Sequence, residues 1–362
     1  MQKNKIIFFI GSLGGGGAER VVCNLANYLK EKEWDISILT MSDKKASYFL
    51  NQGIKLYSLI AQSERKNFVY NLILRYMRFR KYVKTESMDC FVVMLPVTIL
   101  MSLILRRRIS GKLIISERDD PNSYSGVMQC LLKAFSHRAD GFVFQTKDAY
   151  KWYGKYIGEK KIAVIPNAVN KEFLTVDKNV VRENRIIAAG RLVEKKNFGL
   201  LIKAYAKIAD KYPDYKLVIF GDGAEKDTLQ RLSVELNMES KVVLSGYTDN
   251  LKEEFQKSKL FVLSSNYEGI PNTLVEAMAL GLPCIATDCP AGGPKFLIQH
   301  GINGYLTGVG DMEQMAYYMD LLLSSEKLAG KIGKKAQDIT KTLNQDKIYP
   351  DWEGFIKEVI SD

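Results

Sequence analysis

Short apolar runs alternate with helix-like segments along the whole chain, and this alternation restricts the fold more than any other feature. Each run is followed by a polar or glycine-rich turn and then by a segment of helical periodicity. Strands that alternate with helices form parallel sheets. We therefore predict an α/β fold, with strands at residues 6–10, 36–40, 55–59, 90–94, 113–116, 141–145 and 162–165, and again at 185–189, 216–220, 241–244, 260–263 and 283–286.

The length of 362 residues predicts more than one domain, because a single hydrophobic core stops growing at about 250–300 residues. Apolar patterning lapses between residues 170 and 184, after the run at 162–165. We predict domains at residues 1–168 and 185–345, joined by a linker at 169–184. A last helix at 346–362, with Trp352, Phe355 and Ile356 on one face, is expected to cross back to the first domain.

Targeting and membrane-spanning signals are weak in this sequence. Residues 1–17 hold only one five-residue apolar run, which is too short for a signal-peptide core. The longest apolar run, residues 90–105, is interrupted by Pro96 and is shorter than a membrane span. Five cysteines without a C-x-x-C pair indicate reduced thiols rather than a zinc site. We expect a cytoplasmic protein.

The net charge of +11 is concentrated in the first half of the chain. Residues 65–84 mix arginines and lysines with aromatic and aliphatic residues, and they predict a basic amphipathic helix. Such a helix can lie on the anionic inner face of a plasma membrane, as a peripheral contact. The alternative is a solvated face of an ordinary basic protein. Nucleic acid is not expected as a partner, because no nucleic-acid-binding motif accompanies the charge.

The segment 264–283, S-S-N-Y-E-G-I-P-N-T-L-V-E-A-M-A-L-G-L-P, places Glu268 and Glu276 on either side of a predicted helix start. Asn272 and Thr273 are good helix caps, so the backbone N–H groups of Thr273, Leu274 and the next residue can point at an anion. The carboxylates can bind sugar hydroxyls. The alternative is a capping box between Thr273 and Glu276.

A second cluster, G-R-L-V-E-K-K-N at residues 190–197, leaves the first strand of the second domain. Arg191 can pair with diphosphate oxygens in a fork geometry, and Lys196 can act as a point charge on a leaving group. The alternative is a pair of surface cations in a loop. A third cluster, Gly14 to Gly17, follows the first strand, but no register gives the G-x-G-x-x-G pattern of dinucleotide-binding folds.

The absence of any D-x-D sequence removes the usual acidic clamp for a metal-bound diphosphate. Stabilisation of a leaving diphosphate must then come from the protein's own cations and amides. We expect no metal and no cofactor.

Taken together, E-G-x-P, E-x7-E and G-R-x-x-x-x-K resemble the retaining glycosyltransferases of family 4, and the resemblance covers essentially the whole chain. It implies the GT-B fold, with two doubly wound Rossmann-like domains facing a central cleft. It also implies metal-independent transfer of a hexose or N-acetylhexosamine from a nucleoside diphosphate sugar, with UDP as the expected nucleotide. The first domain would bind the acceptor and the second the nucleotide sugar.

The resemblance carries roles to individual residues of this chain. Arg191, Lys196 and Glu268 are the catalytic candidates. The candidates for donor binding are Gly15, Gly16, Tyr247, Asn272, Thr273, Leu274 and Glu276. Those on the acceptor side are Gly17, Glu117, Arg118 and Asp119.

The chain departs from the family after the strand at 113–116. Many members carry a histidine there in a T-x-H-D-like segment, whereas this chain reads Ser116-Glu117-Arg118-Asp119-Asp120. If a general base exists, Glu117 and Asp119 are its candidates. The motif C-P-A-G-G-P at 289–294 resembles transferases that assemble capsule, O-antigen and related lipopolysaccharide or lipid-linked glycans, so a saccharide or lipid-linked saccharide is the expected acceptor. The alternatives are a sugar-nucleotide epimerase of the same fold and a non-catalytic nucleotide-sugar binding protein.

Overall fold

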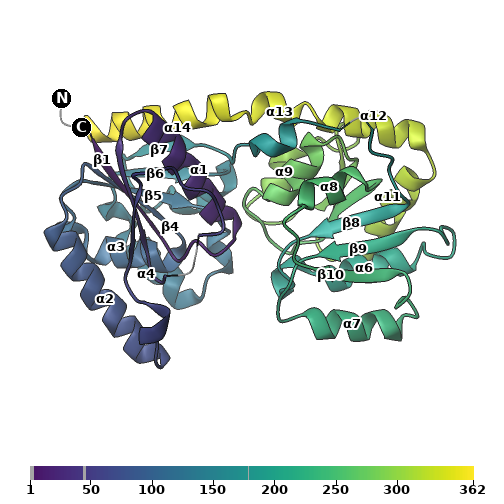
Figure 1. Cartoon of the computed structure of the whole chain (residues 1–362), viewed down its shortest axis with the longest axis horizontal. Coiled ribbons are helices and arrows are strands. Elements are labelled where there is room, and N and C mark those ends of the chain that lie inside the picture. Colours follow the sequence, from purple (N-terminus) through teal and green to yellow (C-terminus); the bar gives the residue numbers. More distant parts are fainter. Residues whose placement is uncertain (1–3, 44–45, 178) are drawn as a thin grey trace. The chain divides into compact units, whose positions relative to one another are not determined.

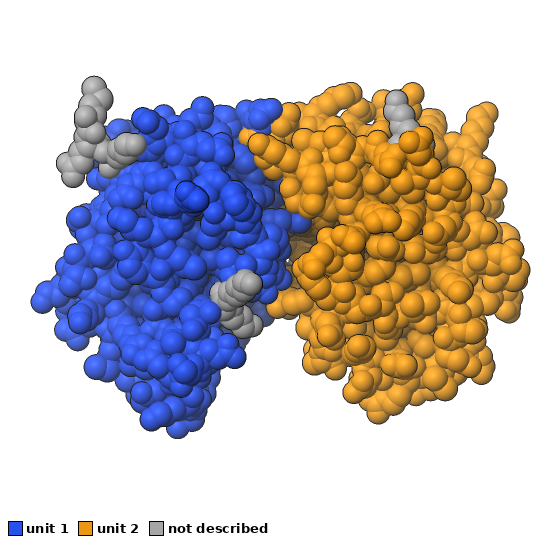
Figure 2. All heavy atoms as spheres, in the orientation of Figure 1, with its two compact units in different colours: residues 1–168, 346–362 blue, residues 169–345 orange. Residues whose placement is uncertain are grey.

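The computed structural model describes residues 4–43, 46–177 and 179–362, and it divides the chain into two compact units. Unit 1 comprises Met1–Ala168 together with Asp346–Asp362, and unit 2 comprises Val169–Gln345. Figure 1 traces the chain through its helices and strands, and Figure 2 colours the two units. The predicted α/β class is confirmed, since both units contain a parallel sheet covered by helices.

Unit 1 is built on a seven-stranded sheet in the part of the chain that the structure describes, with the order β3-β2-β1-β4-β5-β6-β7. All of its paired strands are parallel. The strands are β1 Lys5–Ile10, β2 Asp35–Thr40, β3 Lys55–Ser58, β4 Cys90–Met94, β5 Lys112–Glu117, β6 Gly141–Phe144 and β7 Lys161–Val164. The helices are α1 Gly17–Glu31, α2 Phe68–Thr85, α3 Pro96–Ile104, α4 Gly126–Phe135, α5 Lys147–Tyr153 and α14 Gln345–Ile360.

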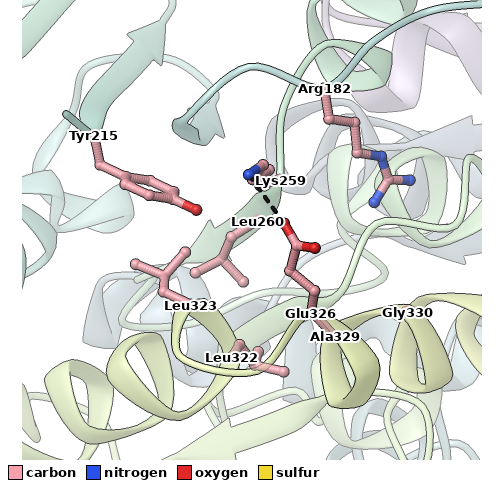
Figure 3. Close-up of a pocket in the computed structure, with 9 residues that line it drawn as sticks. All are labelled: Arg182, Tyr215, Lys259, Leu260, Leu322, Leu323, Glu326, Ala329 and Gly330. Carbon is pink, nitrogen blue, oxygen red and sulfur yellow. Dashed lines mark hydrogen bonds and ion pairs between the residues drawn. The ribbon is translucent and has the colours of Figure 1, made fainter.

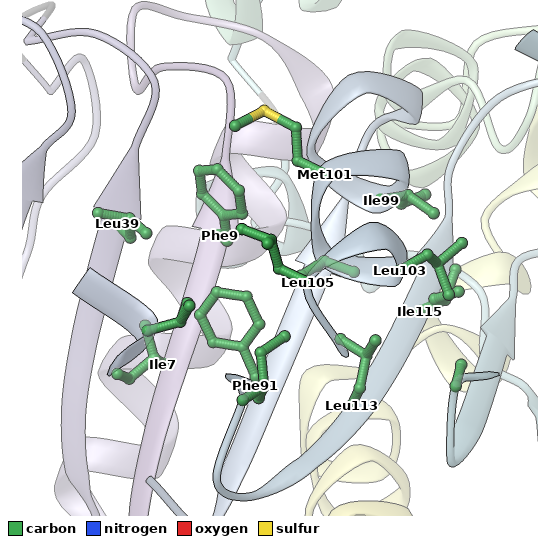
Figure 4. Close-up of a cluster of buried hydrophobic side chains, with 14 of the residues drawn as sticks. Ile7, Phe9, Leu39, Phe91, Ile99, Met101, Leu103, Leu105, Leu113 and Ile115 are labelled. Atoms are coloured by element: carbon green, nitrogen blue, oxygen red, sulfur yellow. The ribbon is translucent and has the colours of Figure 1, made fainter. Parts of the chain in front are cut away.

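The core of unit 1 forms where the central strands meet the helices on one side of the sheet (Figure 4). Phe9 of β1 stacks on Phe79 of α2 with ring centroids 4.7 Å apart, and Phe91 of β4 lies 5.9 Å from Phe9. Fully burying one such side chain contributes roughly 1.5–3 kcal/mol. These aromatic contacts therefore fix α2 on the sheet through its inner face.

The C-terminal helix α14 packs on unit 1. Trp352, Phe355 and Ile356 are all buried, and Tyr28 of α1 donates a hydrogen bond of 3.1 Å to Glu353. Gly141 of β6 lies against this helix, where an added Cβ would come 2.9 Å from a methyl group of Val359. A single apolar stripe thus holds the helix against the sheet.

Unit 2 is built on a six-stranded parallel sheet, counted over the described residues, in the order β10-β9-β8-β11-β12-β13. The strands are β8 Arg185–Ala189, β9 Lys216–Phe220, β10 Val242–Gly246, β11 Leu260–Leu263, β12 Cys284–Thr287 and β13 Tyr305–Thr307. The helices are α6 Phe198–Ala206, α7 Lys226–Glu235, α8 Leu251–Gln256, α9 Asn272–Ala279, α10 Gly293–Leu297, α11 Met312–Leu323, α12 Glu326–Ala336 and α13 Ile339–Thr342.

The start of unit 2 has structure of its own. Residues 169–184, which we expect to link the domains, include the short 3₁₀ helix η5 (Lys171–Leu174). Phe173 in this segment is buried, and its ring lies 6.3 Å from that of Phe255 in α8. The segment therefore packs on unit 2.

No helix among the described residues has both the length and the apolar character that crossing a bilayer requires.

Candidate active site

The cationic and acidic motifs of unit 2 meet at the carboxyl edge of its sheet. The neighbouring strands β8 and β11 are parallel, so the loops that leave them begin at the same edge. The strand order reverses here, because β9 and β10 lie on one side of the pair and β12 and β13 on the other. In doubly wound sheets, ligands bind at such a switch point. The loop with Arg191 and Lys196 follows β8, and the loop with Glu268 follows β11.

The centre of this site is the carboxylate of Glu268, which is only 6% exposed. Lys196 donates to its Oε1, and the ammonium of Lys195 lies 3.6 Å from its Oε2. Burial alone would raise the pKa of Glu268, but Lys196 and then Lys195 outweigh it and hold this pKa below its ordinary value. The carboxylate is therefore ionised at neutral pH.

Polar contacts join the two loops directly. The hydroxyl of Ser264 donates to the carbonyl of Lys196 at 2.8 Å, and the amide N–H of Asn266 donates to the carbonyl of Lys195 at 2.8 Å. The hydroxyl of Ser265 donates to Oε1 of Glu268, also at 2.8 Å. These bonds hold Lys195, Lys196 and Glu268 in fixed positions relative to one another.

Arg191 differs from its neighbours because it is exposed, and no carboxylate among the described residues pairs with it. Lys195, by contrast, lies 4.7 Å from the ring centroid of Tyr267 as well as near Glu268. An unpaired guanidinium at a switch point can bind an oxyanion with two parallel hydrogen bonds. Arg191 is thus the cation of this site most available to a ligand.

Two glycines permit the close packing of loops at this edge. A Cβ on Gly293 would fall 1.6 Å from the carbonyl oxygen of Gly269, and a Cβ on Gly221 would fall 1.8 Å from that of Gly190. The amide of Glu268 also donates to the carbonyl of Pro290 at 3.0 Å. The C-P-A-G-G-P segment therefore supports the turn that carries Glu268.

The start of α9 differs in detail from the prediction. Asn272 and Thr273 are not the cap; the helix begins at Asn272 and Pro271 is its N-cap, without a side-chain cap. The amides of Leu274 and Val275 both donate to the carbonyl of Pro271 at 3.1 Å, so they are not free to bind an anion. Of the three backbone N–H groups that were expected to bind an anion, only that of Thr273 remains available among the described residues.

The other two donor-side candidates of unit 2, Glu276 and Tyr247, differ in their exposure to solvent. Glu276 lies within α9 and is buried. Because Pro271 and not Thr273 is the N-cap of this helix, Thr273 and Glu276 do not form the alternative capping box. Tyr247 follows β10 at the same edge of the sheet and exposes its ring. The pKa of Tyr247 is raised, mainly by its side-chain hydrogen bond to Asp249 and to a smaller extent by partial burial. An exposed ring beside the strand ends offers a flat apolar face for a nucleobase.

The glycine candidates of unit 1 occupy the equivalent edge of the first sheet. Gly15 and Gly16 follow β1, and α1 begins at Gly17 with Gly16 as its N-cap. A Cβ on Gly16 would lie 2.2 Å from a carboxylate oxygen of Glu19. The side chain of Glu19 thus folds over the start of α1.

The acceptor-side candidates after β5 are not equally available. Glu117 is almost fully buried, and its oxygens accept hydrogen bonds from Tyr124 at 2.6 Å and Tyr153 at 2.7 Å. Burial raises the pKa of Glu117, although the two tyrosines act in the opposite direction. This geometry gives Glu117 a structural role and leaves Asp119, which is partly exposed, as the better-placed candidate base.

Arg118 is buried as well. One of its Nη atoms donates to Asn167 at 3.0 Å, and its guanidinium lies 5.2 Å from the ring of Trp352 in α14. Gln145 donates to the same oxygen of Asn167 at 2.7 Å. Residues that follow β5, β6 and β7 are thereby tied together beneath the C-terminal helix.

A pocket of about 330 Å³ opens elsewhere in unit 2 (Figure 3). Lys259 and Leu260 line it at the start of β11, and Tyr215 lines it just before β9. This is the amino edge of the sheet, opposite to the motifs. The pocket is therefore not part of the site around Glu268.

Sequence patterns did not single out Ser265 or the contact of Lys195 with Glu268. Lys195 belongs to a motif that was recognised, but its partner Glu268 lies on a loop about 70 positions away. Ser265 and Glu268 are only three positions apart in one loop. The described residues hold no group of three or more His, Cys, Asp or Glu side chains that could bind a metal ion.

The fold and site define a glycosyltransferase of the GT-B type. A model for glycosyltransferase family 4 matches residues 15–173, and a model for glycosyl transferases group 1 matches residues 171–339. The chain belongs to this family of glycosyltransferases, and its predicted family membership is confirmed.

The chain is similar to proteins of known and unknown activity. An uncharacterised glycosyltransferase of Haemophilus influenzae is 29% identical over 97% of this chain and 99% of its own. An α-1,4-N-acetyl-D-galactosaminyltransferase of Campylobacter jejuni, named for an undecaprenol-PP-linked acceptor, is 28% identical over 98% and 99%. The structure of Anabaena HepE with UDP and glucose superposes with a TM-score of 0.84, at 18% identity, over 98% of this chain and 100% of that one.

Proposed function

We propose that this glycosyltransferase moves a hexose or N-acetylhexosamine from a UDP-sugar to a lipid-linked saccharide, with retention of the anomeric configuration and without a metal ion. The observation that carries the proposal is the arrangement after β8 and β11. An unpaired Arg191 lies in the same loop as Lys196, which is bound to the buried Glu268. A diphosphate needs cations, and a sugar needs hydrogen-bond acceptors.

Each candidate residue has a different role in the proposed reaction. Arg191 binds the diphosphate oxygens, and Lys196 supplies a second positive charge as the glycosidic bond breaks and negative charge develops on the leaving phosphate. Glu268 accepts hydrogen bonds from hydroxyls of the transferred sugar, since its carboxylate stays ionised. The acceptor hydroxyl attacks from the face that the diphosphate leaves, and its proton passes to a phosphate oxygen or to a base such as Asp119.

Similar proteins support the choice of substrates. The Anabaena structure with the same fold holds UDP, and the Campylobacter relative is named for an acceptor linked to undecaprenyl diphosphate. We infer the same two classes of substrate for this chain, in the assembly of a bacterial surface glycan.

The experiment is a transfer assay with a panel of UDP-, GDP- and ADP-sugars and an undecaprenyl-diphosphate-linked disaccharide, with products identified by mass spectrometry. One UDP-sugar is expected to extend the acceptor by one residue, and NMR of the product should show the donor's anomeric configuration. Activity should persist in EDTA. Transfer only from another nucleotide, an inverted product or loss of activity that only divalent ions restore would each contradict a part of the proposal.

An epimerase of the same fold is the competing function. It would release UDP, or interconvert the donor, without a saccharide acceptor. Measuring UDP release with and without acceptor separates the two, because a transferase releases UDP mainly when acceptor is present. We favour transfer, since Arg191, Lys196 and Glu268 together fit a leaving diphosphate and a bound sugar.

A further inference from the structure

The pocket at the amino edge of the sheet in unit 2 is large enough for a small organic molecule (Figure 3). Its volume is about 330 Å³, and sites for small molecules typically measure about 300–1,000 Å³. Residues from β11, α11 and α12 line it, together with Arg182 from the segment before β8 and Tyr215 from the segment before β9. The pocket therefore lies within one unit and apart from the motifs at the carboxyl edge.

Arg182 brings a positive charge without an acidic partner to this pocket. One of its Nη atoms donates to the carbonyl oxygen of Gly281 at 3.0 Å, and no carboxylate among the described residues forms an ion pair with it. Burial lowers the pKa of Arg182, because its guanidinium has lost part of its hydration. A guanidinium has five N–H donors, so Arg182 keeps donors for a ligand.

Lys259 is the second cation of the pocket, and its acidic partner is exposed. The ammonium lies 3.4 Å from Oε1 of Glu326, whose side chain is 88% exposed. A surface pair of this kind contributes little to stability, so the carboxylate of Glu326 can turn into solvent when another anion approaches Lys259. Two cations against one carboxylate leave the lining with a net positive charge.

The rest of the lining is mainly apolar. Leu260 and Leu322 are buried, and Leu323 is partly buried. Tyr215 adds the face of its ring, and the ammonium of Lys259 lies 5.6 Å from the centroid of that ring. An inorganic ion would leave the apolar wall in water, and an uncharged molecule would leave Arg182 without a counterion. The lining therefore matches a molecule with an anionic head and an apolar body.

We propose that this pocket binds a small organic anion, with a carboxylate or phosphate head and an apolar body about the size of one ring. Arg182 and Lys259 supply the positive charge for the head, and the leucines and the ring of Tyr215 contact the body. Because the pocket lies at the edge of the sheet opposite to Glu268, it is a second ligand site and not part of the donor site. The proposal does not depend on which sugar or acceptor the chain uses.

NMR titration of the full chain with benzoate and with phenyl phosphate tests the proposal, without donor or acceptor. At least one of the two anions should bind saturably, with a dissociation constant of about 1 mM, as is typical of ligands this small. Benzyl alcohol has a ring without the charge, and inorganic phosphate has the charge without a ring. Each should bind at least about 10-fold more weakly. Equal binding of benzyl alcohol would overturn the proposal, as would the lack of saturable binding of both organic anions.

The cations at the carboxyl edge also attract anions, so the two sites must be separated. A saturating concentration of UDP should leave the affinity for the organic anion unchanged, and so should Arg191→Ala. Competition with UDP would place the anion near Arg191 and would overturn the proposal. That outcome would leave the proposed transfer reaction intact, and failure of the transfer assay would likewise leave the pocket intact.

Two variants of opposite sign test whether the charges of the pocket act on the ligand directly. Lys259→Gln should weaken binding about 10-fold, because it removes a charged donor. Glu326→Gln should strengthen binding about 3-fold, because it removes the carboxylate that competes for Lys259. A variant that merely disturbed the structure would weaken binding in both cases, and weaker binding in Glu326→Gln would overturn the proposal.

The matched control is Lys257→Gln, two positions from Lys259 and outside the pocket. The side chains of Lys257 and Lys259 are 32% and 28% exposed, and each forms one surface ion pair with a glutamate. Lys257→Gln should bind the anion like the unaltered chain. An equal loss of affinity in both lysine variants would show that overall charge, and not the pocket, attracts the anion, and would overturn the proposal.

Arg182→Gln should also weaken binding about 10-fold. Because Arg182 bonds to Gly281 as well, its unfolding temperature is measured alongside. Ala329→Phe, which places a ring in the pocket, keeps the test decisive if Arg182→Gln does not fold. Normal binding of the anion by Ala329→Phe would overturn the proposal.

Discussion

Lys196 donates a hydrogen bond to Glu268, a carboxylate that is almost fully buried at the carboxyl edge of the second sheet. The two residues lie 72 positions apart, on loops that follow the adjacent strands β8 and β11. A buried ion pair of this kind adds little net stability, but removing one partner leaves a costly unpaired charge. The pair is therefore best understood as a device that holds a charged carboxylate and an ammonium group in fixed positions.

Arg191→Ala should lower kcat/KM by about 10²–10³ while leaving the fold unchanged. We expect this loss because the substitution removes a donor that stabilises negative charge on the leaving group. Removing one such donor lowers the rate by a similar factor in other transfer reactions. Stability should change by less than about 0.5 kcal/mol, since Arg191 is exposed and makes no ion pair with a described carboxylate. Steady-state kinetics and thermal unfolding measure the two effects. Near-normal turnover would remove Arg191 from the mechanism.

Lys196→Ala should affect both stability and activity. Glu268 would keep the hydrogen bond from Ser265, but the more distant Lys195 would be its one remaining cation, so the free energy of unfolding should fall by about 3 kcal/mol. The double variant Lys196→Met with Glu268→Met removes both charges and should recover most of that stability, yet it should remain inactive. Denaturant unfolding and the transfer assay check these outcomes. A double variant as unstable as Lys196→Ala would show that the pair's charges are not the cause.

Glu268→Gln should change how stability depends on pH. The pKa of Glu268 in the folded protein is below its ordinary value of 4.5, so the unfolded chain binds the proton more readily. The stabilisation from the carboxylate is therefore complete above about pH 4.5 and is lost as pH falls through the lower folded pKa. The difference in Tm between the unaltered chain and Glu268→Gln should be largest near pH 7 and should shrink on acidification. A difference that is constant down to about pH 3 would contradict this assignment.

Much of the fold follows from the sequence, because buried parallel strands produce apolar runs that end in recognisable turns. The bounds of β8, β9 and β11 agree with those predicted from the pattern. β13 was missed because it has only three residues between Gly304 and Gly308, too few for a periodic signal. The N-cap at Pro271 was also missed, because intrinsic preferences favour Asn272 or Thr273 as the cap.

The candidate site was predictable only in part, because local motifs mark individual residues but do not show which residues of distant loops come into contact. Arg191, Lys196 and Glu268 lie in local motifs, so sequence spacing marks them as candidates, and the structure places Lys196 against Glu268. The approach of Lys195 to Glu268 depends on how two loops meet across adjacent strands, which no local pattern encodes. The bond of Ser265 to Glu268 joins residues three positions apart in one loop, and no motif marked Ser265 as its donor. The burial of Glu117 beneath Tyr124 and Tyr153 likewise comes from tertiary packing.

Gly293→Ala should disrupt the turn that carries Glu268, because the new methyl group would fall 1.6 Å from the carbonyl oxygen of Gly269. Backbone atoms cannot move aside as a flexible side chain can, so the turn itself must shift. A shift of about 1 Å in a catalytic group can cost about 10² in rate. We therefore expect kcat to fall by at least about 10²-fold, together with a lower Tm.

The matched control is Gly354→Ala on α14, where an added Cβ meets no atom within 4 Å. Alanine is a better helix former than glycine, so this variant should be neutral or stabilised by up to about 1 kcal/mol, with normal kcat. The two variants make the same chemical change, and only the surroundings of the methyl group differ. If Gly293→Ala kept normal turnover, the close approach of the C-P-A-G-G-P segment would not be what positions Glu268.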